Sequence, residues 1–311
     1  MNNNALHARS AAYELDMNDQ VRDMLAAAAT KDPDFQNSCM SHDLKRRIKW
    51  NWSDYATFDY PKSVDDSIFI HHPDAAVDVG LDGDHGPSGL FVQSGKDGRP
   101  LILVRSPDDA FLPRVHFTLL HEIGHLLQRG ESTLARRLFR LEDDVMRKRF
   151  EEDACNRFAS RSLLPDDYME SMFENQGVTA QNIRSIYDDD LNRWRSGSIN
   201  YQRVSRPCIV RRAAEMMDDP GSVTLLNPKG ELSIRAFSDG HCEYQPHDGT
   251  SGVSTAEREI LSLFPKRLDH RELSPMQLDN LQEVKDAIHV SVAGSFSGRT
   301  SMHTLIVIRR H

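Results

Sequence analysis

The amino-acid sequence predicts an α+β fold with helical extensions and a separate C-terminal α+β domain. Two observations predict this fold. In the first half of the chain, short β-like runs separated by glycine-rich turns come directly before two long helical patterns. After the turn-forming segment DDPG at 218–221, short strand and helix patterns alternate again. The 311 residues, 39% of them hydrophobic, are enough for two hydrophobic cores.

Residues 1–60 are expected to form an N-terminal helical arm, since apolar positions recur on a polar segment between about 11 and 29. From Ser67 the runs SIFIHH, SGLFVQS and LILVR predict strands, and the turn GKDGRP joins the last two into a hairpin. One helix should follow through FTLLHEIGHLLQ and end near Gly130. A second is expected within VMRKRFEEDACNRFASRSLL, which Pro165 terminates, so we assign 61–170 to one core domain.

The second half of the chain is predicted to contain two further parts. Helices up to about Met217 should form a closing region over 171–218. Residues 219–311 are expected to form the C-terminal α+β domain, with helices over 255–264 and 275–288. Its strands are predicted from the runs SVTLLN, LSIRAFS, HVSVAGS and HTLIVIRR.

Charge and cysteine content argue against several classes of protein. With 38 basic and 47 acidic residues the net charge is -9, which does not suit a protein that mainly coats nucleic acid. No run approaches the roughly 18 apolar residues of a membrane span, and the N-terminus lacks the apolar core of a signal peptide. We therefore expect a cytoplasmic protein with no membrane partner. The four cysteines form no C-x-x-C pair, which predicts reduced thiols.

The segment from His121 to His125 reads His-Glu-Ile-Gly-His, an H-E-x-x-H motif. Histidines four residues apart lie on the same side of a helix, so both imidazoles can reach one metal ion. Glu122 would stand at the edge of that site and act as a general base on a metal-bound water. The alternative is a pair of hydrogen-bonded core histidines. Gly124 costs about 1 kcal/mol against alanine inside a helix, which predicts a close approach by another backbone or by substrate.

A catalytic zinc ion needs a third protein ligand. No downstream histidine has a suitable spacing, so we expect a carboxylate. On a helical wheel, Glu151 projects nearest the apolar stripe of its helix, which favours it on periodicity alone. The candidates are Glu131, Glu142, Glu151, Glu152 and Asp153.

The two helical segments FTLLHEIGHLL and EEDACNRFASRSLLP resemble the ImmA/IrrE family of bacterial metallopeptidases. The family's second helix reads E-x-x-A-[ND]-x-F-A-x-x-L-L-x-P, and its first glutamate is the third metal ligand. The resemblance implies a zincin-like metallopeptidase core, a Zn²⁺ ion held by His121, His125 and Glu152, and Glu151 as the second choice. Mn²⁺ also suits such a ligand set. The residues that match the second pattern are Glu152, Asn156, Phe158, Ala159, Leu163 and Pro165.

This sequence departs from the family pattern in three places, one of which is His116, where a family member more often has arginine. The Leu-Leu-Pro portion lacks the residue that usually separates leucine from proline. Cys155 occupies the position of a small alanine, where its thiol could compete for a soft metal.

The resemblance also implies a substrate class. Family members cut one partner protein, typically a helix-turn-helix repressor of a stress regulon or mobile element. The basic runs KRRIK, RRLFR and RKR suggest DNA as an activator. The C-terminal domain resembles, in architecture only, a GAF- or PAS-like sensor, and dimerisation or docking would serve it equally. Rival hypotheses are a non-catalytic, metal-stabilised regulatory protein and the enzymatic half of a toxin-antitoxin pair.

Overall fold

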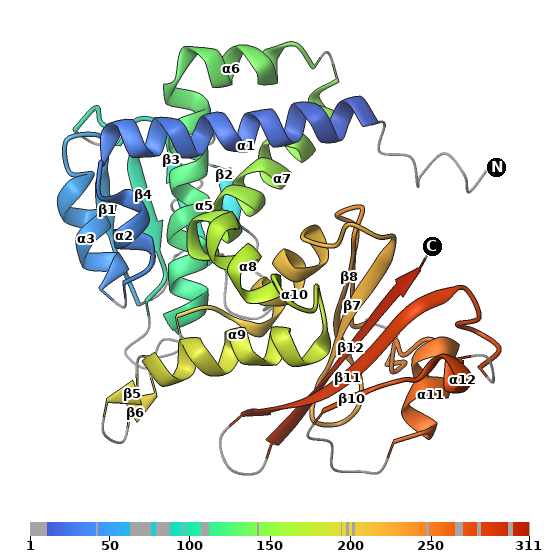
Figure 1. Cartoon of the computed structure of the whole chain (residues 1–311). Helices are drawn as coiled ribbons and strands as arrows, with labels where there is room; N and C mark the ends of the chain where they lie inside the picture. Colours follow the sequence, from blue (N-terminus) through green and yellow to red (C-terminus); the bar gives the residue numbers. More distant parts are fainter. Residues whose placement is uncertain are drawn as a thin grey trace. The chain divides into compact units, whose positions relative to one another are not determined.

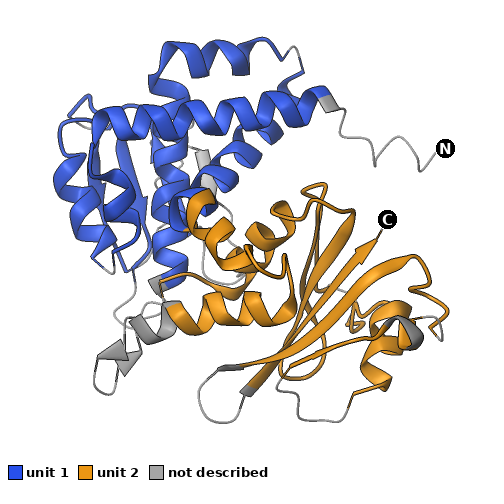
Figure 2. Ribbon diagram, viewed as in Figure 1, with its two compact units in different colours: residues 1–163 blue, residues 164–311 orange. Residues whose placement is uncertain are grey.

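The computed structural model confirms an α+β fold, with a four-stranded and a six-stranded sheet in different halves of the chain (Figure 1). The chain divides into two units, residues 1–163 and 164–311 (Figure 2). The finer division at 60, 170 and 218 stays a prediction. The structure describes residues 11–41, 43–62, 76–78, 88–95, 97–106, 112–141, 143–193, 195–196, 199–200, 203–246, 249–264, 270–278, 281–297 and 301–310.

The first unit contains a four-stranded sheet in the order β1-β4-β3-β2, where β1 is parallel to β4 and the other neighbours are antiparallel. The predicted hairpin is confirmed as β3 and β4, and the run SIFIHH lies outside the described residues. The strands are β1 (Thr57–Asp59), β2 (Ala76–Asp78), β3 (Gly89–Val92) and β4 (Leu101–Val104). The helices are α1 (Ala11–Lys31), α2 (Phe35–Cys39), α3 (Leu44–Asn51), α5 (Leu112–Gly130), α6 (Ser132–Phe139) and α7 (Asp144–Leu163).

Helix α5 is the centre of this unit. It packs against β3 and β4 on one side and against α7 on the other. This packing buries its apolar stripe. Helix α1 lies across α5 and α7 (Figure 1), so the predicted N-terminal arm belongs to the same unit as the two motif helices. The buried stripe of α5 consists of Leu119, Leu120, Ile123, Leu126 and Leu127.

The second unit is built on the antiparallel sheet β10-β11-β12-β7-β8-β9, in which the first strand, β7, pairs with the last, β12. Its strands are β7 (Gly221–Leu226), β8 (Leu232–Phe237), β9 (Cys242–Tyr244), β10 (His270–Glu272), β11 (Ala287–Ser297) and β12 (Ser301–Arg310), and β5 (Arg195–Ser196) pairs separately with β6 (Ile199–Asn200). Its helices are α8 (Asp166–Phe173), α9 (Ala180–Arg193), α10 (Arg206–Glu215), α11 (Thr255–Ser262) and α12 (Pro275–Leu278).

All four predicted strands of the C-terminal domain are confirmed, but the helix predicted over 275–288 is wrong. Helix α12 ends at Leu278, residues 282–286 form bends and turns, and β11 begins at Ala287. The apolar residues Leu278, Leu281 and Val284 all belong to the core of the sheet domain. A three-residue spacing of apolar side chains suits successive turns over a core as well as a helix. The GAF- or PAS-like comparison stays a prediction.

Gly124 in α5 lies directly against α7. A Cβ built on it would lie 2.9 Å from Cys155 Sγ and 3.1 Å from the Cys155 Cα atom. The glycine predicted to need a close neighbour therefore has one, and it is the backbone of the second motif helix.

Gly124→Ala should destabilise the protein by about 1–3 kcal/mol, because overpacking against α7 outweighs the helix propensity that alanine adds. Chemical denaturation measures the change in the free energy of unfolding. In Gly130→Ala the new methyl group meets nothing within 4 Å, so this control should leave stability unchanged or raise it. A gain in stability for Gly124→Ala would contradict the packing argument.

A buried ion pair ties α11 to the sheet of the second unit. Glu257 is 1% exposed and accepts hydrogen bonds from Arg235 Nε at 2.8 Å and from Thr224 Oγ1 at 2.6 Å. Burial alone would raise the pKa of Glu257, but these hydrogen bonds outweigh it and hold the pKa below its ordinary value. The carboxylate is therefore ionised and neutralises a guanidinium that is also largely buried.

Glu257→Gln should cost about 3–5 kcal/mol at neutral pH, because Arg235 loses its buried counter-charge. The native ion pair contributes stability above the ordinary pKa of glutamate and loses it as the pH falls through the lowered pKa. The difference between the native chain and the variant should therefore narrow in acid. Glu283→Gln, an exposed position in the same unit, should change stability by less than about 0.5 kcal/mol in the same denaturation series. Equal losses in both variants would refute the argument.

Candidate metal centre

The H-E-x-x-H segment lies in the middle of α5, where all three polar side chains are buried. His121, Glu122 and His125 are at most 1% exposed, although their neighbours on the helix are leucine and isoleucine. Burying an imidazole or a carboxylate is unfavourable unless it has a compensating partner. The partners of the two histidines come from α7, which packs along α5.

The two imidazoles face each other and a carboxylate of α7. His121 Nε2 and His125 Nε2 are 3.2 Å apart, and Glu152 places one oxygen 3.3 Å from the first and the other 3.4 Å from the second. Burial raises the pKa of Glu152, but the hydrogen bond with His121 and the charge of the two rings in their protonated form outweigh burial and hold this pKa below its ordinary value, so the carboxylate is ionised. The residue that the family pattern selects is thus the one on the Nε2 side of both rings.

The other ring nitrogen of each histidine is bound on the opposite side. His125 Nδ1 lies 2.8 Å from Glu151 Oε1, and His121 Nδ1 lies 3.1 Å from Asn156 Oδ1. Both partners are acceptors, so in the neutral form of each ring Nδ1 carries the proton and Nε2 presents its lone pair. Such acceptors behind metal-binding histidines fix the ring tautomer.

Glu151, the alternative ligand, therefore sits behind His125 and away from the facing Nε2 atoms. Its Oε1 also accepts a hydrogen bond from Arg129 Nε at 2.8 Å. Burial opposes ionisation of Glu151, but the bonds from His125 and Arg129 prevail and lower its pKa to about 2. Burial lowers the pKa of His125 and outweighs the hydrogen bond with Glu151, which raises it. The His125 ring is therefore neutral at pH 7.

Two of the other acidic candidates have partners elsewhere. Glu131 forms an ion pair with Lys31 at 2.7 Å, and Asp153 accepts a hydrogen bond from the Tyr13 hydroxyl at 3.0 Å. Neither is placed with the two histidines by the structure. Glu142 lies outside the described residues.

Glu122 points to the sheet side of α5, toward β3. A Cβ built on Gly89 would lie 2.4 Å from Glu122 Oε1 and 2.4 Å from Thr118 Cγ2, so only glycine leaves room for this carboxylate. No periodic pattern in the sequence indicates a role for Gly89. Its role follows from the packing of a strand against a helix, which brings together residues 33 positions apart.

The Cys155 thiol also lies in this cluster, because one ligand atom from each of Cys155, His121 and His125 falls within 4.8 Å of the others. Gln128 Nε2 donates to Cys155 Sγ at 3.0 Å, and burial together with the nearby carboxylates raises the thiol pKa well above its ordinary value. In the absence of metal Cys155 is thus a neutral thiol, whereas Glu152 is already a carboxylate. We therefore favour Glu152 as the third donor.

A buried amide network, which the sequence reading missed, supports these helices. Gln128 Nε2 also donates to the Glu151 carbonyl at 3.0 Å, and Gln20 Nε2 in α1 donates to Gln128 Oε1 at 3.0 Å. Arg137 in α6 then donates to Gln20 Oε1 at 2.7 Å. Both glutamines are completely buried. Isolated glutamines in separate helices carry no spacing signal, so only the tertiary structure could have identified this network.

The donor set fits a divalent metal ion. Tetrahedral ligands at about 2.0–2.1 Å from a zinc ion lie roughly 3.3–3.4 Å from one another, and the three separations here are 3.2–3.4 Å. Two lone pairs and a carboxylate that face each other at this distance repel unless a cation lies between them. The neutral imidazoles and the ionised Glu152 are the protonation states that metal binding requires.

Comparisons with known proteins agree with this geometry. Residues 85–188 match the model of the peptidase M78 family, described as the IrrE N-terminal-like domain. No curated protein matches the sequence. One similar solved structure is described as a Mycobacterium tuberculosis transcriptional regulator, with 12% identity, a TM-score of 0.48, and coverage of 96% of this chain and 81% of that chain. A likeness this distant carries no argument about function.

The family match spans the hairpin, α5 and α7, the elements that carry the facing histidines and carboxylates. Together with the buried histidine cluster it supports a metal-dependent peptidase. No helix in the described parts of the chain is long and apolar enough to cross a membrane. Residues 85–188 are thus similar to the IrrE N-terminal-like domain of the peptidase M78 family.

Proposed function

We propose that this chain is a zinc-dependent endopeptidase that makes one specific cut in a partner protein. The observation that carries the proposal is the convergence of His121 Nε2, His125 Nε2 and the Glu152 carboxylate within 3.4 Å, with the buried Glu122 on the same helix. His121, His125 and Glu152 would hold the ion. Zn²⁺ is the ion we propose, and Mn²⁺ suits the same donors.

When bound, the ion would polarise the scissile carbonyl and lower the pKa of the attacking water to about 7. The protein supplies the proton transfers. Glu122 takes a proton from the attacking water and later delivers it to the leaving amine nitrogen. Gly89 leaves the space that this carboxylate occupies, and the packing of β3 keeps its side chain in place. Glu151 and Asn156 hold the two imidazoles in the required tautomer.

The proposed substrate is a helix-turn-helix repressor of a stress regulon or mobile element, and DNA is proposed as an activator. The support for this substrate is the family resemblance of α5 and α7. A purely structural metal site would not need a buried carboxylate such as Glu122 beside its ligands, which weighs against the rival regulatory protein without catalysis.

Glu122→Gln should keep its metal but lose at least about 10²- to 10⁴-fold in cleavage rate, since glutamine cannot accept the proton. His121→Ala should lose the metal as well. Metal content is measured by elemental analysis of the purified chain. Cleavage is followed by mapping new protein termini after incubation with candidate repressors or whole lysate, with and without a chelator.

Cleavage that survives unchanged in Glu122→Gln would exclude Glu122 as the base. A native chain that stays metal-free in the presence of added zinc would exclude the metallopeptidase. If lysate proteins other than DNA-binding proteins gain new termini in a chelator-sensitive way, the peptidase stands and the proposed substrate is wrong.

Gly89→Ala should reduce cleavage by about 10- to 100-fold while the metal content stays unchanged. The new methyl group would displace the Glu122 carboxylate from β3, and a small misplacement of a catalytic group is costly. Gly130→Ala is the matched control and should keep full activity. Loss of the metal in Gly89→Ala would show that the strand supports the ligands rather than the base.

A further inference from the structure

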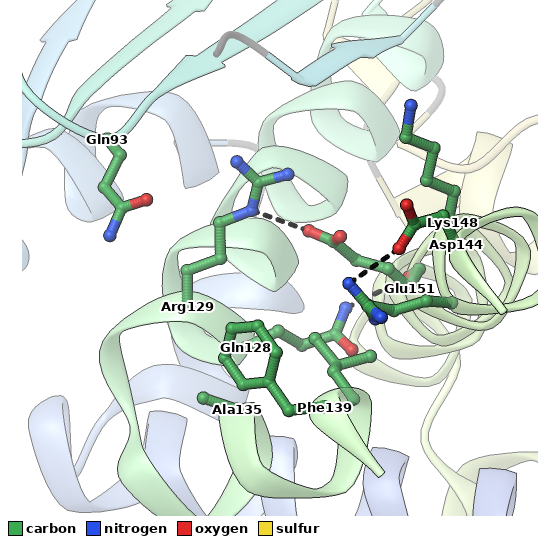
Figure 3. Close-up of a pocket in the computed structure, with 10 residues that line it drawn as sticks. Gln93, Gln128, Arg129, Ala135, Phe139, Asp144, Lys148 and Glu151 are labelled. Carbon is green, nitrogen blue, oxygen red and sulfur yellow. Dashed lines mark hydrogen bonds and ion pairs between the residues drawn. The ribbon is translucent and has the colours of Figure 1, made fainter. Parts of the chain in front are cut away.

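The basic runs RRLFR and RKR, which the proposed chemistry does not use, border a pocket in the first unit. Helices α5, α6 and α7 and the end of β3 enclose a cavity of about 470 Å³, a size typical of binding sites. Figure 3 shows Ala135 and Phe139 on the α6 side of this cavity, and Asp144 and Lys148 on the α7 side. The pocket thus lies beside the metal centre on the same helices.

An exposed aromatic ring lies at the mouth of the pocket. Phe139 at the end of α6 lines the pocket and is 72% exposed. The Arg147 guanidinium lies over the Phe139 ring, 5.7 Å from its centroid, which keeps the ring at the rim. An exposed aromatic side chain beside a cavity is typical of an interaction site.

The net charge of the residues around the pocket is positive, whereas that of the whole chain is negative. The charged residues that line the pocket are the basic Arg129, Arg147 and Lys148 and the acidic Asp144 and Glu151, although the net charge of the protein is -9. Arg129 is paired with Glu151 and Arg147 with Asp144. Among the residues that the structure describes, Lys148 forms no ion pair. The rim therefore offers positive charge to a partner.

The lining favours a protein segment over nucleic acid. Leu138 and Ala135 contribute an apolar surface that would accept a bulky side chain, which a nucleic-acid backbone does not offer. Acidic residues on either side of the bulky one would meet the positive rim. Nothing in the lining provides the extended basic track that a nucleic-acid backbone requires.

A single side chain, Glu151, lies between the pocket and His125. Glu151 lines the cavity, and the same carboxylate oxygen receives hydrogen bonds from Arg129 on the pocket side and from His125 Nδ1 on the other, each at 2.8 Å (Figure 3). A segment seated in the pocket would lie behind His125, outside the side where the Nε2 atoms meet. It would hold a protein near the centre without occupying the place of the scissile bond.

We propose that this pocket docks an acidic segment of the protein substrate, with one bulky apolar side chain between α6 and α7 and its carboxylates on the rim at Lys148. The inference rests on the proposed peptidase function, whose substrate it describes by chemistry. It assigns to the substrate an apolar residue flanked by aspartate or glutamate, separate from the bond that is cut.

The test uses the full-length Glu122→Gln chain and a synthetic peptide with a central leucine-phenylalanine pair flanked by aspartates. A second peptide has lysines in place of the aspartates. Fluorescence anisotropy should show saturable binding of one acidic peptide per chain and no binding of the basic one. Adding Lys148→Glu should weaken binding about tenfold, and adding Phe139→Ser about fivefold. Lys229→Glu makes the same charge change at an exposed turn of the second unit and should have no effect.

The proposal is overturned if the acidic peptide does not saturate, or if Lys148→Glu and Lys229→Glu weaken it equally. A different occupant would also overturn the proposal. This is the case if the acidic peptide does not bind, but duplex DNA or a second copy of the chain does, and if Lys148→Glu or Phe139→Ser abolishes that binding. Both side chains are exposed, so both variants should fold. Because binding is measured without cleavage, a negative result here leaves the peptidase test untouched, and a failed peptidase test leaves peptide binding measurable.

Discussion

The close packing of α5 on α7 is the contact on which the rest of the first unit depends. At Gly124 the two helices are so close that an added Cβ would meet the backbone of Cys155 at 3.1 Å. One turn away, this same contact brings the Glu152 carboxylate within 3.4 Å of both Nε2 atoms. A wider interhelical distance would separate the donors, and no single side chain could restore them. The absence of a side chain at Gly124 is thus a condition for the two histidines and the Glu152 carboxylate to face one another.

The groups behind the donors explain why α1 belongs to the same unit. A buried imidazole, carboxylate and amide each need a partner, and a site with many of them needs a network. Gln20 brings α1 into that network through Gln128, and Arg137 extends it to α6. The helix that the sequence predicted as an arm therefore supplies buried hydrogen bonds to the helices that carry the site.

The sequence could predict those parts of the site that are local in the chain. The H-E-x-x-H spacing places His121 and His125 on one side of a helix, and the hairpin and α5 follow from turns and periodicity. Periodicity favoured Glu151 over Glu152. Glu151 lies beside His125 Nδ1, and periodicity alone could not tell which ring nitrogen this carboxylate would meet. Gly89 and the glutamine network depend on segments far apart in the chain, so no local pattern indicates them.

Glu151 and Glu152 differ in exposure, and this difference indicates which side of the site opens to solvent. The side chain of Glu151 is 11% exposed and is held by Arg129, whereas that of Glu152 is 42% exposed although it faces two buried imidazoles. A catalytic metal site must keep one side open to water and substrate, while a structural site is closed. The side that opens to solvent here is the side of Glu152. The buried carboxylate thus suits the fixed support behind a ring, and the half-exposed one suits a ligand at the entrance of a working site.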